Sequence, residues 1–212
     1  MPEITARMLF IGNSFTTRND LPGLLSTIAK AGKGITIESK VVSAGGASLR
    51  RHWNAGAAHA ITDGKWDYVV FQEQSTPPIK NGKRFHENVR EFVPAMKLGG
   101  GMMVLFMTWA RKQVPESQKL PTDSYNEIGS ELAATVIPVG TAWRKLLEEH
   151  DEPALHAEDG SHPSVAGSYL AACTFYAALF DGDPTKLETN IGGVTVEERE
   201  LLQQIALAVC RE

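Results

Sequence analysis

Two segments near opposite ends of the chain carry the residue types that nucleophilic catalysis requires. Ser14 lies in the segment 12–16 (GNSFT), directly after an apolar run. A serine hydroxyl is a weak nucleophile at its ordinary pKa, so it needs an adjacent base. The segment 159–163 (DGSHP) supplies a carboxylate, Asp159, and an imidazole, His162. In a tight loop Asp159 can accept from one ring nitrogen of His162 and leave the other to face Ser14.

Each of these residues also has a plainer interpretation. A serine in a strand-to-helix turn is common for structural reasons, and Asp159 or Ser161 can cap a following helix. His156, Asp159 and His162 recur at a spacing of three, which on a helix would place possible metal ligands on one face. Pro163 disfavours helical geometry at His162, however, so we predict no metal site.

The elements that must position these residues alternate along the chain. Short apolar runs predict strands, and helical spacing predicts helices between them. Asp20 is a predicted helix cap, with Pro22 in the first turn. The long polar connection 110–124 is expected to be a lid or a surface loop. The strands are predicted at 7–12, 35–43, 67–71, 102–108 and 135–139, and helices at 47–61, at 85–98 with a break near Pro94, and at 169–180.

Strands separated by helices imply parallel pairing through right-handed crossovers. The strands lack a clean alternation of apolar and polar residues, as expected when helices cover both faces. The predicted fold is therefore one α/β domain over residues 1–212, a three-layer α/β/α sandwich with five parallel strands and Pro138 on an edge strand. Ligands of such sheets bind beyond the carboxyl ends of the strands, here 12–18, 43–48, 72–78 and 108–111.

The two end segments resemble blocks of a known family. Residues 10–15 (FIGNSF) and 159–163 (DGSHP) resemble the first and last blocks of the SGNH subgroup of the GDSL esterase/lipase family. Asn13 departs from the usual aspartate. The resemblance implies a flavodoxin-like topology, with Ser14 as nucleophile, His162 as general base and Asp159 as its orienting acid.

The family's middle blocks supply the oxyanion hole, together with the N–H of Ser14. By resemblance, the backbone N–H of a glycine after the second strand is one donor, and we choose Gly46 over Gly45. The third block normally carries an asparagine, but none follows the third strand until Asn81. A glutamine carboxamide offers the same donor, so we expect Gln74, or else Gln72, to replace it.

Aromatic and titratable residues around these blocks carry further expectations. Trp53 and Trp109 follow the second and fourth strands, so either can line a substrate subsite. Trp66 and Trp143 are expected to pack in the interior. His52 and His59 are expected on a helix surface. Cys173 and Cys210 are expected to be reduced, one buried and one near the surface, because two cysteines make no disulfide framework.

The favoured function is hydrolysis of a small acyl ester through an acyl-enzyme, without a metal or organic cofactor. An acetyl group on a carbohydrate is one such substrate. A flavodoxin-like module is the first alternative, because the loop with Ser14, Thr16, Thr17 and Asn19 could hold a phosphate or flavin. An inactive hydrolase-fold binding protein is the second. No P-loop motif and no G-x-S-x-G elbow are present in the sequence.

The composition and charge of the chain indicate which kinds of binding partner to expect. Apolar residues make up 42% and charged residues 22% of the chain, which is typical of a globular protein. A net charge of −4, with no basic stripe, argues against nucleic-acid binding. No apolar run reaches the length of a membrane span. Because residues 1–7 show no signal-length apolar stretch, we expect a soluble, cytoplasmic protein with a small-molecule partner.

Overall fold

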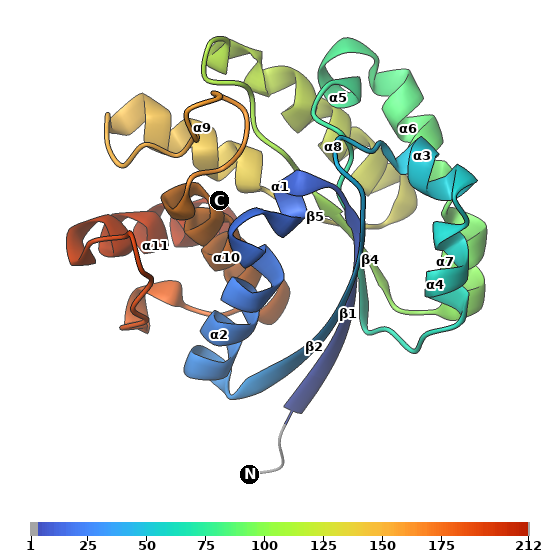
Figure 1. Cartoon of the computed structure of the whole chain (residues 1–212), viewed down its shortest axis with the longest axis horizontal. Helices are drawn as coiled ribbons and strands as arrows, with labels where there is room; N and C mark the ends of the chain where they lie inside the picture. The colour runs from blue at the N-terminus through green and yellow to red at the C-terminus, as the bar shows by residue number, and fades with distance from the viewer. Residues whose placement is uncertain (1–3, 212) are drawn as a thin grey trace.

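The computed structural model describes residues 4–211 and contains one five-stranded sheet. The strand order is β2-β1-β3-β4-β5, and all four pairings are parallel. Helices cover both faces of the sheet (Figure 1). The predicted three-layer flavodoxin-like sandwich is therefore confirmed. The strands are β1 (Ile4–Gly12), β2 (Ile35–Ser43), β3 (Tyr68–Phe71), β4 (Met102–Phe106) and β5 (Thr135–Ile137).

The first layer of helices packs on one face of the sheet and encloses the larger apolar core. This core contains Met8, Phe10 and Val70 from the strands, together with Leu25 and Phe175 from the helices. The helix α10 is apolar on all sides and lies between its neighbours, as expected for a buried helix. The helices of this layer are α2 (Leu21–Lys33), α9 (Val139–Glu149), α10 (Val165–Phe180) and α11 (Val196–Arg211).

The second layer packs on the other face, around Leu9, Ile11, Phe71 and Leu105. Alternate residues of β1 therefore face different cores, which follows from the two-residue repeat of a strand. The helices of this layer are α3 (Leu49–Asn54), α4 (Ala57–Thr62), α6 (Gly82–Arg90), α7 (Val93–Gly99) and α8 (Lys119–Leu132). The shorter helical segments elsewhere are α1 (Ser14–Thr17), η1 (Arg18–Asp20), α5 (Pro77–Lys80), η2 (Pro115–Gln118) and η3 (Pro184–Lys186).

Two predicted helices are each divided in the structure. The helix expected at 47–61 is split into α3 and α4 at Gly56, whose φ of 81° lies in the left-handed region. The helix expected at 85–98 is split into α6 and α7, with Pro94 in the first turn of α7, where a missing N–H costs little. The Asp20 cap is confirmed, because its side chain accepts from the N–H of Gly23.

The expectation of a loop or lid at 110–124 was wrong for residues 115–124, which are helical. The 3-10 helix η2 begins at Pro115, and α8 begins at Lys119. Pro121 lies in the first turn of α8, while Tyr125 and Ile128 pack into the core behind it. The polar residues of this segment form the outer side of a helix. No helix among residues 4–211 is long and apolar enough to cross a membrane.

Candidate active site

Ser14 follows the carboxyl end of β1, which lies between β2 and β3, and it is the first residue of α1. Asn13 caps this short helix, because its Oδ1 accepts from the N–H of Phe15 at 3.0 Å. The Asn13 Nδ2 donates to the carbonyl of Ala47 at 3.0 Å. A Cβ at Gly12 would lie 2.6 Å from Thr16 Oγ1 and 2.7 Å from Gln72 Oε1, so a larger residue here would crowd the side chains that support the turn. The turn thus holds the Ser14 hydroxyl near the carboxyl ends of the strands.

The loop 159–163 fixes the orientation of the His162 ring. Asp159 Oδ1 accepts from the backbone N–H groups of Ser161 and His162, each at 2.9 Å. Asp159 Oδ2 accepts from His162 Nδ1 at 2.5 Å. The two backbone N–H groups and then the imidazole hold the pKa of the Asp159 carboxyl well below its usual range. Asp159 therefore remains an acceptor and places the available lone pair of the ring on Nε2.

Ser14 and His162 meet although 148 positions separate them in the chain. The Ser14 Oγ lies 2.8 Å from His162 Nε2, which is hydrogen-bonding distance. From the sequence, one ring nitrogen of His162 is expected to face Ser14 and the other to bond Asp159. Both contacts are present, so Ser14, His162 and Asp159 form one line of hydrogen bonds. Such an arrangement can transfer the serine proton to the imidazole while the carboxylate stabilises the resulting cation.

Asn19 joins the segment after Ser14 to the segment after His162. Its Nδ2 lies 3.2 Å from the carbonyl of Pro163 and 2.9 Å from that of Ser164. Asn19 has a φ of 55°, a left-handed conformation that asparagine tolerates better than most residues. From the sequence, Asn19 is predicted only as a phosphate contact. Its positional role depends on a partner far along the chain, so no local pattern reveals it.

The segments proposed for the oxyanion hole lie at the ends of β2 and β3, beside β1. Gly46 has a φ of 62°, and its N–H has no hydrogen-bond partner among residues 4–211. The Gln74 Oε1 accepts from the N–H of Thr76 at 2.8 Å. Because this contact uses the oxygen end of the carboxamide, the Nε2 end of Gln74 is left to donate elsewhere.

Gln72 has a different place, and the alternative that it donates to an oxyanion requires correction. Its side chain is fully buried beneath the turn that carries Ser14. Its Oε1 accepts from the Asn13 N–H at 2.9 Å and from Thr16 Oγ1 at 3.1 Å. Its Nε2 donates to the carbonyl of Glu73. Gln72 therefore supports the turn that carries Ser14, and its complete burial keeps its carboxamide from a substrate.

Glu73 is a buried carboxylate that links three elements. It accepts from the N–H of Leu49 at 3.0 Å, from the N–H of Gln74 at 2.8 Å and from Asn88 Nδ2 at 2.8 Å. Burial raises the pKa of the Glu73 carboxyl, and these hydrogen bonds oppose the rise. Glu73 thus holds the backbone on which Gln74 is mounted.

Trp109 is not a substrate-lining residue in this structure, because it is only 2% exposed. Its ring stacks on Phe15 on one side, with centroids 4.7 Å apart, and on Trp143 with centroids 3.9 Å apart. Its Nε1 donates to the carbonyl of Ser161 at 3.0 Å. Trp109 therefore packs behind Ser14 and His162 and contacts the segments that carry both.

Trp53 is half-buried and packs edge-on against Phe92 at the margin of the second core, so its role in a substrate subsite stays a prediction. The prediction for His52 was wrong. His52 is 4% exposed instead of lying on the surface, and its Nε2 contacts the carbonyl of Gly12 at 2.7 Å. The expected exposure of His59 and burial of Trp143 are confirmed. Cys173 and Cys210 are free, and Cys173 is buried.

The side chains expected of a flavodoxin-like phosphate site are already engaged. Thr16 is buried and bonds to Gln72, while Asn19 bonds to carbonyl groups of the His162 segment. A phosphate would have to displace contacts that build the turn. A parallel α/β/α sandwich with a Ser–His–Asp arrangement at the carboxyl ends of its strands instead matches the class of serine hydrolases.

Comparisons with known proteins agree with this class. No protein-family model matches the sequence, and no curated protein is similar to it. A DUF4886 family protein from Bacteroides uniformis is 22% identical, with a TM-score of 0.83, over 97% of this chain and 94% of that protein. A candidate SGNH hydrolase from Slackia heliotrinireducens is 27% identical, with a TM-score of 0.71, over 82% of this chain and 99% of that protein.

An enzyme with a named substrate shares the fold as well. An acetyl xylan esterase from Geobacillus stearothermophilus, crystallised as a variant, is 18% identical, with a TM-score of 0.66, over 84% of this chain and 96% of that protein. The chain therefore shares the fold of these proteins.

Proposed function

We propose that this protein is a serine esterase that cleaves small acyl esters through an acyl-enzyme. One observation carries the proposal, namely the line of contacts from Ser14 Oγ to His162 Nε2 at 2.8 Å and from His162 Nδ1 to Asp159 at 2.5 Å. The fold shared with ester-cleaving enzymes supports the same reaction class.

In the first step His162 accepts the proton of Ser14 as the serine oxygen attacks the ester carbonyl. The resulting oxyanion accepts hydrogen bonds from the N–H groups of Ser14 and Gly46 and from the Gln74 carboxamide. His162 then protonates the departing alcohol. In the second step His162 takes a proton from the water that attacks the acyl-enzyme, and it returns this proton to the Ser14 oxygen as the acid leaves. Asp159 orients the ring and stabilises its cation throughout.

The glutamine in place of the usual asparagine is part of this proposal. Two contacts of Gln74 support it. The Thr76 N–H donates to Gln74 Oε1 and so restricts this longer side chain, and the Glu73 carboxylate accepts from the backbone N–H of Gln74. For substrate we propose a small acyl group such as acetyl, carried by a carbohydrate or another small molecule. The acetyl xylan esterase among the structural neighbours supports this choice.

The decisive experiment compares the wild type with Ser14→Ala and with the control Ser130→Ala, which removes an exposed serine of α8. We expect hydrolysis of p-nitrophenyl acetate and labelling by a fluorophosphonate in the wild type and the control. Both should be lost in Ser14→Ala. Unchanged labelling of Ser14→Ala would disprove its role as nucleophile, and a wild type that neither hydrolyses nor labels would disprove the esterase function.

A further inference from the structure

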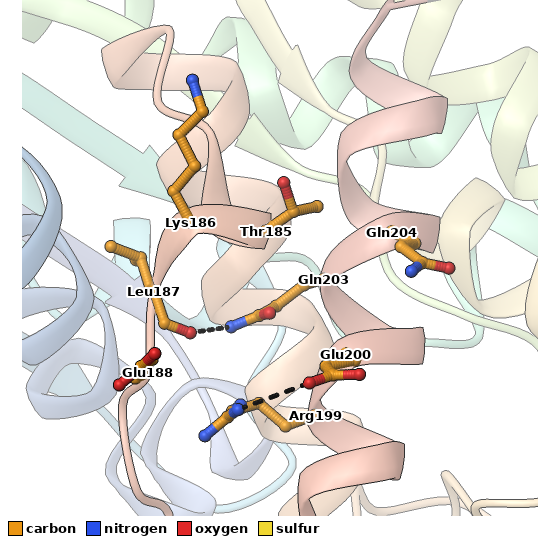
Figure 2. Close-up of a pocket in the computed structure, with 8 residues that line it drawn as sticks. All are labelled: Thr185, Lys186, Leu187, Glu188, Arg199, Glu200, Gln203 and Gln204. Atoms are coloured by element: carbon orange, nitrogen blue, oxygen red, sulfur yellow. Dashed lines mark hydrogen bonds and ion pairs between the residues drawn. The ribbon is translucent and has the colours of Figure 1, made fainter.

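Polar side chains outside the proposed reaction differ in what they contact. In the hollow between η3 and α11, drawn in Figure 2, the buried Gln203 donates to the carbonyl of Leu187 and to the hydroxyl of Tyr169. The lining of this hollow includes two cations and two carboxylates, so its charges balance. His156 is buried as well, but its contacts lie on the segments around the candidate base, His162.

The imidazole of His156 is fixed by a hydrogen bond to the backbone. In the sequence, His156 stands out only because it recurs with Asp159 and His162 at a spacing that metal ligands can have. In the structure its Nε2 lies 2.9 Å from the carbonyl oxygen of Ala110, and the side chain is 7% exposed. Because a carbonyl oxygen can only accept, Nε2 must carry the hydrogen of this bond. The contact ties His156 to the residue that follows Trp109.

His156 also stands at one end of a stack of aromatic rings. Its ring meets Trp143 edge-on, with centroids 5.2 Å apart and an interplanar angle of 71°. Trp143, Trp109 and Phe15 then stack with interplanar angles of 3° and 2°. At the other end, Phe15 meets the ring of His162 edge-on. The stack therefore joins the two histidines by a continuous series of ring contacts.

His156 and Pro163 flank the loop 157–162, which carries Asp159 and His162. The two flanking residues form an antiparallel bridge, so the ends of the loop lie side by side. Next to this bridge, the N–H of Ala157 donates to the carbonyl of His162 at 2.8 Å. A displacement of His156 would therefore move the end of the loop that carries the His162 ring.

The segment after β4 holds the same loop at a second point. The N–H of Lys112 donates to the carbonyl of Gly160 at 2.9 Å. Gly160 is buried, and a Cβ there would lie 2.4 Å from Gln113 Nε2. Ala110 thus holds one end of the loop through His156, and Lys112 holds its middle. Together these contacts fix the loop relative to the sheet.

We propose that His156 is a positioning residue for the esterase reaction, an inference that rests on the proposed function. Its hydrogen bond to Ala110 and its contact with Trp143 hold the loop so that His162 Nε2 lies 2.8 Å from Ser14 Oγ. Because its ring is buried and its Nε2 is engaged by Ala110, His156 exchanges no proton with the substrate. Its loss should slow proton transfer from Ser14 to His162 without changing how the ester binds.

Two substitutions of His156 separate positioning from packing. His156→Met cannot donate to Ala110, whereas the carboxamide of His156→Gln can place a donor where the ring Nε2 lies. For p-nitrophenyl acetate, we expect kcat of His156→Met to fall at least about tenfold, with KM within about twofold of the wild type. His156→Gln should restore kcat to within about threefold of the wild type. His86→Met is the control, because it removes a comparable contact, to the carbonyl of Ser124 at 2.8 Å, and its kcat should stay within about twofold.

Amide hydrogen exchange supplies a readout that needs no esterase activity. We expect the amides of residues 157–162 to exchange about fivefold faster in His156→Met than in the wild type, with no change in helix α2. His156→Asn, whose carboxamide is one methylene shorter than that of His156→Gln, should behave as His156→Met does. A wild type without hydrolysis would refute the proposed function, while the exchange rates would still show whether His156 fixes the loop.

The assignment is overturned if kcat of His156→Met equals that of His86→Met, or if exchange of residues 157–162 is unchanged. It is also overturned if exchange rises equally in α2, because His156 would then only stabilise the fold as a whole. Failure of His156→Gln to restore kcat would contradict a positioning role through the hydrogen bond to Ala110.

Discussion

The indole Nε1 of Trp109 donates to the carbonyl of Ser161, one residue before His162, while the same ring stacks on Phe15, one residue after Ser14. A single buried side chain therefore contacts both segments that supply the candidate catalytic groups. Phe15 in turn meets the His162 ring edge-on, with centroids 5.5 Å apart. The separation of Ser14 and His162 thus depends on packing beneath the site as well as on the loop that carries each residue.

Replacing Trp109 with phenylalanine should separate this positional effect from general stability. Trp109→Phe keeps an aromatic ring but removes the hydrogen bond to Ser161, a loss of about 1 kcal/mol. We expect kcat for p-nitrophenyl acetate to fall by roughly fivefold, with little change in KM. Trp66→Phe is the control, because it removes a comparable N–H contact, to the carbonyl of Ala60, away from Ser14. Equal kcat values in the two variants would refute a positioning role.

Asp159→Asn should leave the loop in place but disturb the imidazole. The asparagine Oδ1 can still accept from the N–H groups of Ser161 and His162. The amide would favour the wrong tautomer of His162, so we expect kcat to fall by about 10⁴-fold. Asp151→Asn, at an exposed position, serves as the control. Retention of more than a tenth of the wild-type kcat in Asp159→Asn would contradict the assigned role.

Gln74→Ala should reduce catalysis without unfolding the protein. Losing one oxyanion donor typically lowers kcat by about 10²–10³-fold, and Gln74 is only partly buried. The comparison is Gln72→Ala, which should lower Tm because it removes the partners of Asn13 and Thr16 from a fully buried position. Measurement of kcat and Tm on both variants distinguishes a loss of catalysis from a loss of stability. A normal kcat in Gln74→Ala would remove this residue from the oxyanion hole.

Glu73 should make stability depend on pH in a defined direction. Burial raises the pKa of Glu73 in the folded protein above its ordinary value of 4.5, so the folded state holds this proton more tightly than the unfolded state. The associated stability is present below pH 4.5 and is lost as the pH rises through the higher folded value. Relative to Glu73→Gln, the wild type should therefore lose unfolding free energy across this range. Urea denaturation at a series of pH values measures the difference, and a constant difference would contradict the raised pKa.

Sequence patterns predict most of the sheet, because buried parallel strands are short apolar runs. The bounds expected for β2 match the structure, and β3 and β4 differ only at their ends. The central contact, Ser14 to His162, is also predictable, since each residue lies in a recognisable block. The break at Gly56 and the helix at 119–132 are harder to predict, because tertiary packing decides whether a glycine interrupts a helix and whether polar residues form one face.

Supporting residues escape prediction for a different reason. Trp109 after a strand suggests a pocket wall, and nothing near it in the sequence reveals Phe15 and Trp143 on its two faces. His52 likewise follows helical spacing on a polar segment, yet its ring reaches the carbonyl of Gly12. These roles depend on partners tens of residues away, which only the folded chain brings together.

The distance of 148 positions between Ser14 and His162 also orders events during synthesis. A ribosome adds Ser14 and then the strand β5 before it reaches the segment that carries His162. A nascent chain can therefore pair its five strands while Ser14 has no imidazole beside it. Under the proposed function, hydrolysis therefore requires synthesis to continue past His162, and no acyl-enzyme forms by this mechanism on a chain that ends before it.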